Sequence, residues 1–193
     1  MRLLSSCLPL AVLLLVTPVS ASPKSKAKGG DKEAKEAIHW NADQFILESE
    51  KKYFKHLHQL TFDGENAEAY WDRDGRHLVF QRTGVDGDGL TTGCDQIYRI
   101  DIVTGETELI STGDGRTTCS FAIPETTKVL FASTHANSAD CPPKPDMSQG
   151  YVWPIYPGYD IYTRDLATQT LAPLVHHTGY DAEATTDPSG TWM

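Results

Sequence analysis

A turn-and-strand pattern recurs along the chain and constrains its fold more than any other feature. The first copy is the stretch 61–80 (TFDGENAEAYWDRDGRHLVF). A second begins at Gly113 (GDGRTTCSFAIPETTKVLF) and a third at Thr178 (TGYDAEATTDPSGTWM). Each copy has a glycine-containing turn, a short strand and a second turn bearing Pro or Gly, and the first two continue into an apolar strand. Such internal recurrence indicates a repeat architecture.

The spacing between copies predicts four strands in each repeat. The apolar strands at 77–80 (HLVF) and 128–131 (KVLF) are 51 residues apart, whereas the strands that follow them, QIYRID and DIYTRD, are 64 apart. The difference falls in one connection, because 83–95 has 13 residues where 134–159 has 26. We therefore expect an all-β fold, a partial β-propeller with two four-stranded blades and the start of a third.

The N-terminal region predicts export. Arg2 precedes an apolar run, and Val19-Ser20-Ala21 places small residues at a cleavage position, so residues 1–21 are predicted to be a cleavable signal peptide. The apolar run is short for a membrane anchor, and no transmembrane segment is expected after cleavage. Residues 22–37, rich in Lys, Gly and Ser, are predicted to be a flexible linker. The repeats then occupy 58–193.

A short helix is predicted between the linker and the repeats, over residues 38–57. Asn41 is a suitable N-cap, and Gln44 stands at the partner position of a capping box. Ile46, Tyr53 and Leu57 would form one apolar face of this helix.

Export would place three cysteines, Cys94, Cys119 and Cys141, in an oxidising compartment. Three cysteines allow one internal bridge and leave one thiol. Blade geometry suggests Cys119 paired with Cys94, which is slightly favoured, or with Cys141. Metal binding is the weaker alternative, because no two of them are close in sequence and none has a His at a zinc-type spacing.

The long connection 134–159, called the insertion below, is a candidate binding segment. It contains several prolines and the aromatic residues Tyr151, Trp153 and Tyr156. Tyr and Trp dominate binding hot spots, so the insertion is interpreted as a recognition surface. A lid packed on the fold's own face is an equally good interpretation.

The segments 70–80 (YWDRDGRHLVF) and 187–192 (DPSGTW) resemble the WD40-like repeat of TolB-type propellers. The resemblance covers about residues 58–193. It implies a periplasmic protein that binds a protein or ligand partner, in TolB-type proteins as part of the Tol–Pal envelope system. An extracellular location is the alternative for an exported chain. The separate α/β domain of that family is missing before the repeats, and two blades and a start cannot close a ring, so we expect a piece of a longer chain. The alternative is the N-terminal propeller of a prolyl-oligopeptidase-type serine peptidase.

Two repeated carboxylates are the main candidate site. Glu68 and Glu183 stand 115 residues apart, in the similar segments 64–69 (GENAEA) and 179–184 (GYDAEA). At the mouth of a propeller channel they would bind a cation or a basic peptide. Hydrogen bonding to the backbone of neighbouring blades is the alternative role.

Motifs for catalysis and cofactors are lacking in the sequence. The chain has no Gly-x-Ser-x-Gly elbow, phosphate loop or HExxH helix, so a non-enzymatic protein without a cofactor is expected. Asp86 and Asp88 suggest a calcium loop, although an ordinary loop tip explains them better. The formal net charge of −9 argues against nucleic acid as a partner.

Overall fold

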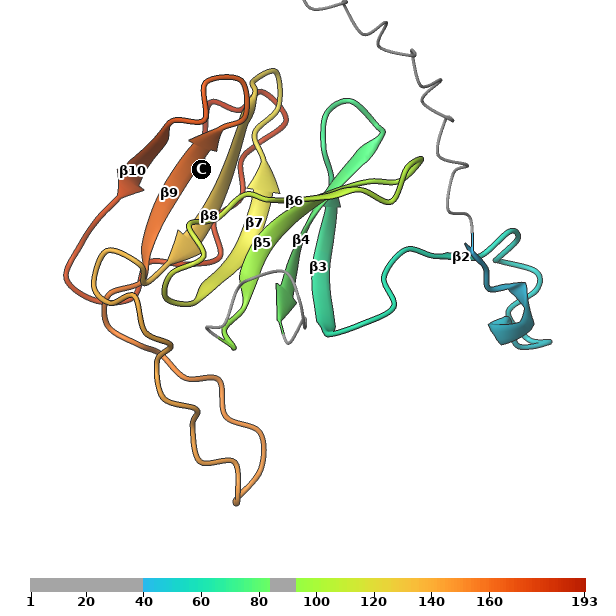
Figure 1. Cartoon of the computed structure of the whole chain (residues 1–193), viewed down its shortest axis with the longest axis horizontal. Helices are drawn as coiled ribbons and strands as arrows, with labels where there is room; N and C mark the ends of the chain where they lie inside the picture. Colours follow the sequence, from blue (N-terminus) through green and yellow to red (C-terminus); the bar gives the residue numbers. More distant parts are fainter. Residues whose placement is uncertain (1–39, 84–92) are drawn as a thin grey trace, which may run out of the picture. The chain divides into compact units, whose positions relative to one another are not determined.

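Two antiparallel sheets contain every strand longer than two residues in the described part of the chain (Figure 1). The computed structural model describes residues 40–83 and 93–193, all within the compact unit Ala34–Met193. The first sheet is formed, in spatial order, by β3 (Glu65–Trp71), β4 (His77–Thr83), β5 (Gln96–Asp101) and β6 (Thr107–Leu109). The second is formed by β7 (Thr117–Ala122), β8 (Lys128–Ser133), β9 (Asp160–Asp165) and β10 (Leu171–Val175). Within each sheet, each strand pairs with the next along the chain, as the repeat spacing predicted.

The turn between the first two strands of each repeat recurs in all three copies. A backbone hydrogen bond closes it from Asp72 N to the carbonyl of His77, at 2.8 Å. The same bond runs from Ile123 N to Lys128 O and from Asp187 N to Trp192 O, each at 2.9 Å. Successive turns are 51 and 64 residues apart, which are the repeat spacings. The third copy therefore has the same turn, although the described residues after Thr178 form no ladder strand.

The core lies between the two sheets. Val79, Ile97 and Ile110 from the first sheet and its following turn pack with Val129 and Phe131 of the second. Each is almost fully buried, which stabilises the fold by about 1.5–3 kcal/mol for each large apolar side chain. The sheets therefore stabilise each other, as neighbouring units of a repeat protein do.

Alternation along β4 gives the first sheet a second apolar face. Phe80 follows Val79 and points to the opposite side, because successive side chains of a strand alternate. There it packs with Tyr98 and Ile100 of β5 in a separate cluster.

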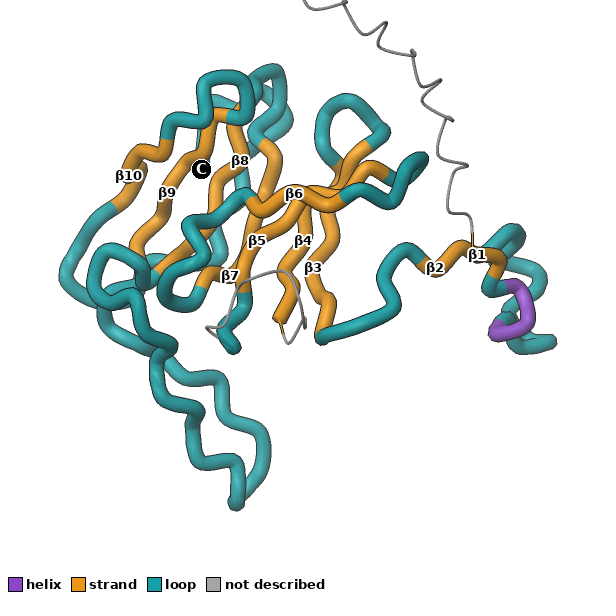
Figure 2. Tube along the Cα trace, viewed as in Figure 1, coloured by secondary structure: helices purple, strands orange, loops and turns teal. Residues whose placement is uncertain are grey.

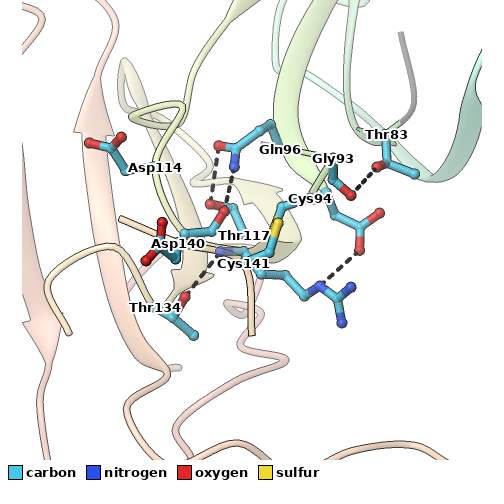
Figure 3. Close-up of a disulfide and its surroundings, with 12 residues drawn as sticks. Thr83, Gly93, Cys94, Gln96, Asp114, Thr117, Thr134, Asp140 and Cys141 are labelled. Carbon is cyan, nitrogen blue, oxygen red and sulfur yellow. Dashed lines mark hydrogen bonds and ion pairs between the residues drawn. A yellow bond between two sulfur atoms is a disulfide. The ribbon is translucent and has the colours of Figure 1, made fainter. Parts of the chain in front are cut away.

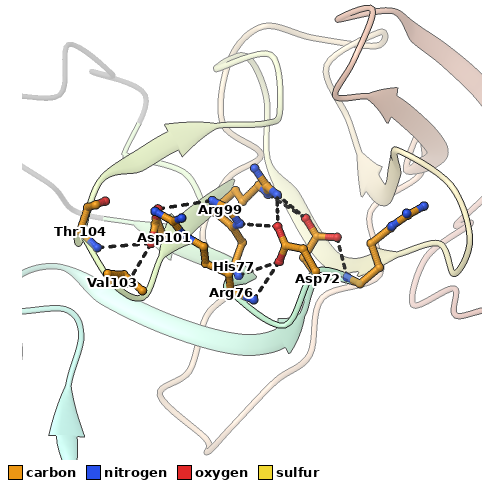
Figure 4. Close-up of polar contacts among 9 residues, drawn as sticks. Asp72, Arg76, His77, Arg99, Asp101, Val103 and Thr104 are labelled. Carbon is orange, nitrogen blue, oxygen red and sulfur yellow. Dashed lines mark hydrogen bonds and ion pairs between the residues drawn. The ribbon is translucent and has the colours of Figure 1, made fainter. Parts of the chain in front are cut away.

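The Asp72–His77 turn is held by side chains as well as by its backbone (Figure 4). Asp72, 8% exposed, accepts hydrogen bonds from the backbone N of Arg73 at 2.7 Å and from Nε of Arg99 at 2.8 Å. Burial acts to raise the pKa of Asp74, but hydrogen bonds from the backbone N of Arg76 and His77 outweigh it and lower that pKa to about 2. The turn is therefore a structural unit in which both carboxylates are occupied.

The prediction of a helix over 38–57 is wrong for the residues of this range that the structure describes, 40–57. A two-stranded ladder joins β1 (Trp40–Asn41) to β2 (His58–Gln59), and the only helical turn between them is a 3-10 turn at Asp43–Phe45. Asn41 does cap a backbone group, since its Oδ1 accepts from Asp43 N at 2.8 Å. Tyr53 and Leu57 are exposed, so the expected apolar face has nothing to pack against, and most helices depend on such packing.

Several predictions fall on residues outside the described ranges. These are the signal peptide 1–21, the linker 22–37 and the calcium loop at Asp86 and Asp88. No helix in residues 40–83 and 93–193 has the length and apolarity needed to cross a bilayer.

Candidate functional site

Three residues at the same place in the three repeats share an unusual backbone conformation. Glu68, Cys119 and Glu183 have φ values of 50°, 51° and 60°. Glu68 and Cys119 each lie in a bulge, where the β3–β4 and β7–β8 registers shift. A left-handed conformation costs a residue with a Cβ about 1–2 kcal/mol, and such outliers concentrate at functional sites.

Glu68, Cys119 and Glu183 all line one cavity of about 440 Å³, called the repeat cavity below. Its lining residues are Glu68 and Tyr70 of β3, Cys119 and Ser120 of β7, Glu183, Ala184 and Thr185 of the third copy, and Trp153 of the insertion. All but Trp153 come from the same short segment of each repeat. The volume is in the range of small-molecule and side-chain pockets.

The carboxylates of the repeat cavity have no cationic partner. Among the described residues, neither Glu68 nor Glu183 forms an ion pair, and the lining contains no Lys, Arg or His. Tyr70 and Trp153 are 41% and 48% exposed, so both contribute accessible surface beside these carboxylates. The cavity is therefore acidic and partly aromatic.

The Cys119 thiol stays protonated at neutral pH. Burial raises its pKa to about 12. The Thr118 hydroxyl, 3.2 Å away, opposes this rise, and the carboxylates of Glu68 and Glu183 add to it. A reactive cysteine has its pKa lowered by nearby positive charge. The surroundings of Cys119 are the opposite of that arrangement.

The Ser120 hydroxyl is a buried polar group without a partner among the described residues. Ser120 is only 2% exposed, and its Oγ has no hydrogen bond although the residue lines the repeat cavity. Leaving a buried hydroxyl unsatisfied costs about 1–3 kcal/mol. The unsatisfied hydroxyl therefore belongs to a residue that lines the repeat cavity.

The carboxylates and thiol of the repeat cavity do not form a compact metal site. In residues 40–83 and 93–193, the group of three possible ligands whose atoms lie within 4.8 Å of one another is Asp72, Asp74 and His77. Arg99 occupies that group, with Nη2 at 2.7 Å from Asp72 and 3.0 Å from Asp74. Those residues belong to the turn in Figure 4 and not to the cavity.

The insertion leaves the end of β8 and returns to β9 as a long loop (Figures 1 and 2). Its Trp153 donates from Nε1 to the Tyr180 hydroxyl at 3.2 Å, which ties the insertion to the third copy. Tyr156 donates to the carbonyl of Pro143 and lines a smaller cavity of about 70 Å³ beside Arg116. Tyr151 is 78% exposed and lines neither cavity. Of the three aromatic candidates, only Trp153 lines the same cavity as Glu68 and Glu183.

The disulfide links Cys94 and Cys141, and Cys119 is free and buried (Figure 3). Both pairings proposed for Cys119 are therefore wrong. Cys119 lies in the bulge of β7 and faces the repeat cavity, whereas the chain around Cys141 is held at the start of β7 by a 2.8 Å hydrogen bond from Gly115 N to Ala139 O. The Cα atoms of Cys94 and Cys141 lie 5.7 Å apart, so the bridge fixes the insertion to the first sheet.

Besides Ala184 and Thr185, sequence reasoning missed three residues of the cavity. Cys119 stands 51 residues after Glu68, the repeat spacing, but it was interpreted only as a disulfide candidate. Ser120 and Tyr70 were not selected, although each lies within two residues of a bulge position. Extending the offset to the neighbours of Glu68 would have found all three.

Comparisons with known proteins found a structural similarity and no sequence relative. No family model matches the chain, and no curated protein matches it. The crystal structure of TolB from Acinetobacter baumannii is similar, with a TM-score of 0.49 and 19% identity over 68% of this chain and 26% of that one. The chain thus spans about a quarter of the length of the TolB chain it matches.

Proposed function

We propose that this chain is part of an exported, non-catalytic binding scaffold of the propeller type, and that the repeat cavity and the insertion together bind a segment of a protein or peptide. The single observation that carries the proposal is the convergence of Glu68, Cys119 and Glu183, equivalent residues of three repeats, on one open cavity. The Glu68 carboxylate also forms a side-chain hydrogen bond with the Cys119 thiol of the next repeat, and hydrogen bonding to the backbone of neighbouring blades is the alternative role for these carboxylates.

The surface beside the cavity supports a polypeptide ligand. Tyr151, Trp153 and Ile155 all expose large apolar or aromatic surface on the same short stretch of the insertion. Exposed aromatic side chains next to a pocket are typical of interfaces whose affinity depends on a few anchors. The Cys94–Cys141 bridge and the Trp153–Tyr180 hydrogen bond hold this stretch in place, which lowers the entropy lost on binding.

The chemistry of the cavity supports binding and not nucleophilic catalysis. The Cys119 thiol is protonated, and no His among the described residues lines the cavity to activate Cys119 or Ser120. The comparisons give no support to the peptidase alternative. The periplasm is the proposed location, on the basis of the N-terminal sequence pattern and the TolB-type repeats.

The test is a selection of peptides on the immobilised full chain, followed by affinity measurement. Trp153→Ala is expected to weaken a selected peptide by about tenfold or more, because truncating an anchor at an interface costs over 1 kcal/mol. Tyr53→Ala is the matched control, since Tyr53 is also an exposed aromatic residue but lies before the repeats. Selection of no peptide, or equal affinity of the Trp153→Ala variant and the unaltered chain, would contradict the proposal.

A further inference from the structure

We infer that the repeat cavity recognises a cationic side chain of its ligand, with the guanidinium group of arginine as the best fit. This inference rests on the proposed function and names the chemical group that the peptide presents to Glu68 and Glu183. The two carboxylates are the only charged groups among the described residues that line the cavity.

Electrostatics selects a cation. Two carboxylates that share a cavity repel each other, and a bound positive charge removes that cost. The neutral Cys119 thiol adds no further charge. In a chain with a formal charge of −9, the surrounding field also favours approach of a cation.

Ser120 gives an independent reason to expect a hydrogen-bonding ligand. Its Oγ is buried and has no partner among the described residues, and Ser120 is one of the residues that line the cavity. A hydroxyl oxygen accepts a hydrogen bond from an N–H donor. A guanidinium carries five such donors in a fixed plane, so it can contact a carboxylate and the Ser120 hydroxyl together.

Size and shape favour an organic cation over a metal ion. The cavity of about 440 Å³ is far larger than an ion needs, and its carboxylates and thiol are not among the described groups that lie within 4.8 Å of one another. The rings of Tyr70 and Trp153 line the same cavity. Aromatic faces attract guanidinium groups through cation–π and stacking contacts, which distinguishes arginine from lysine.

The experiment is isothermal titration of the full chain with three probes. The first is the blocked peptide Ac-Tyr-Gly-Arg-Gly-Tyr-NH₂, and the second replaces its arginine with citrulline, which has the same shape without the charge. The third is agmatine, the free guanidinium amine. The arginine peptide is expected to bind at least about tenfold more tightly than the citrulline peptide, since hydrogen bonds to charged groups are roughly twice as strong as neutral ones.

Variants locate the binding. Glu68→Gln and Glu183→Gln are each expected to weaken the arginine peptide about tenfold, and Ser120→Ala by a smaller factor. Glu108→Gln is the matched control, because Glu108 is an exposed carboxylate on β6 of the first sheet outside the cavity. Circular dichroism melting of each variant separates loss of binding from loss of fold.

The outcomes separate this inference from the proposed function. Binding of the arginine peptide but not the citrulline peptide or agmatine, with loss in both Glu variants, supports both. Equal binding of agmatine supports the cation site and contradicts a peptide ligand. Equal binding of the arginine and citrulline peptides supports peptide binding and overturns the cation site. If the arginine peptide binds the Glu68→Gln and Glu183→Gln variants as tightly as it binds the unaltered chain, the cation site is also overturned.

Discussion

Glu68 and Cys119 occupy the same bulge in consecutive repeats, with φ values of 50° and 51°. Burial, with a further contribution from the Glu68 carboxylate, raises the pKa of the Cys119 thiol. This relationship joins the two sheets at the repeat cavity. It also means that the reactivity of Cys119 reports on the cavity.

Cys119 is expected to resist alkylation. With its pKa raised to about 12, chiefly by burial, the thiolate fraction at pH 8 is about a thousandfold lower than for a thiol of ordinary pKa near 9. Iodoacetamide should therefore modify Cys119 at least about 100-fold more slowly in the folded chain than in urea. Peptide-resolved mass spectrometry after timed quenching measures this. Comparable rates in the two states would show that Cys119 is neither buried nor beside carboxylates.

Asp72→Ala is expected to destabilise the chain by about 3 kcal/mol, because it leaves the Arg99 guanidinium without its main partner and frees the N–H of Arg73. Urea denaturation followed by circular dichroism measures the change. Glu48→Ala is the control, since the exposed Glu48–Lys51 pair should contribute almost nothing. Similar unfolding midpoints for the two variants would contradict a structural role for the turn in Figure 4.

Gly115 and Gly75 form a matched pair for testing the close contact between β7 and the insertion. Both have positive φ, 61° and 63°, so each Gly→Ala change costs about 1–2 kcal/mol in backbone strain. A Cβ at Gly115 would also lie 2.6 Å from Thr134 Oγ1 and 2.9 Å from Ser138 O, whereas one at Gly75 meets nothing within 4 Å.

Gly115→Ala should therefore reduce the melting temperature clearly more than Gly75→Ala, with an additional overpacking cost of about 1–3 kcal/mol. Calorimetry of both variants decides the matter. A smaller effect at Gly115 would mean that residues 134–138 do not pack against the start of β7.

The Cys94–Cys141 bridge is expected to contribute about 4 kcal/mol, the loop-closure value for its sequence separation of 47 residues. The double variant Cys94→Ser/Cys141→Ser should lose that stability, while Cys119→Ser leaves the bridge intact. Non-reducing peptide mapping of exported protein identifies the pairing. A bridge that contains Cys119 would contradict the structure.

The two sheets were predictable because the sequence patterns that specify their strands and turns are local and recur in each repeat. Strands 77–80 and 128–131 and the Asp72–His77 turn follow from apolar alternation and turn residues, and the offset fixes their number. The prediction of a helix over 38–57 was wrong because a periodic apolar face stabilises a helix only where it packs against another surface. Tyr53 and Leu57 of that face are exposed.

The candidate site was predictable only in part. The offset of 115 residues linked Glu68 to Glu183, but the contribution of Trp153 depends on the path of the insertion, which no spacing encodes. The bridge likewise depends on how far the insertion folds back towards Cys94. Ser120 became notable only once its hydroxyl was found buried and without a partner in the described chain.

The most direct test of the account is the position of the bound guanidinium, measured by nuclear Overhauser effects between the full chain and the arginine peptide. The side chain of that arginine is expected to show contacts to the ring protons of Tyr70 and Trp153, and to lose them in the Glu68→Gln/Glu183→Gln double variant. Contacts to other parts of the chain, with none to these two rings, would contradict a ligand site in the repeat cavity.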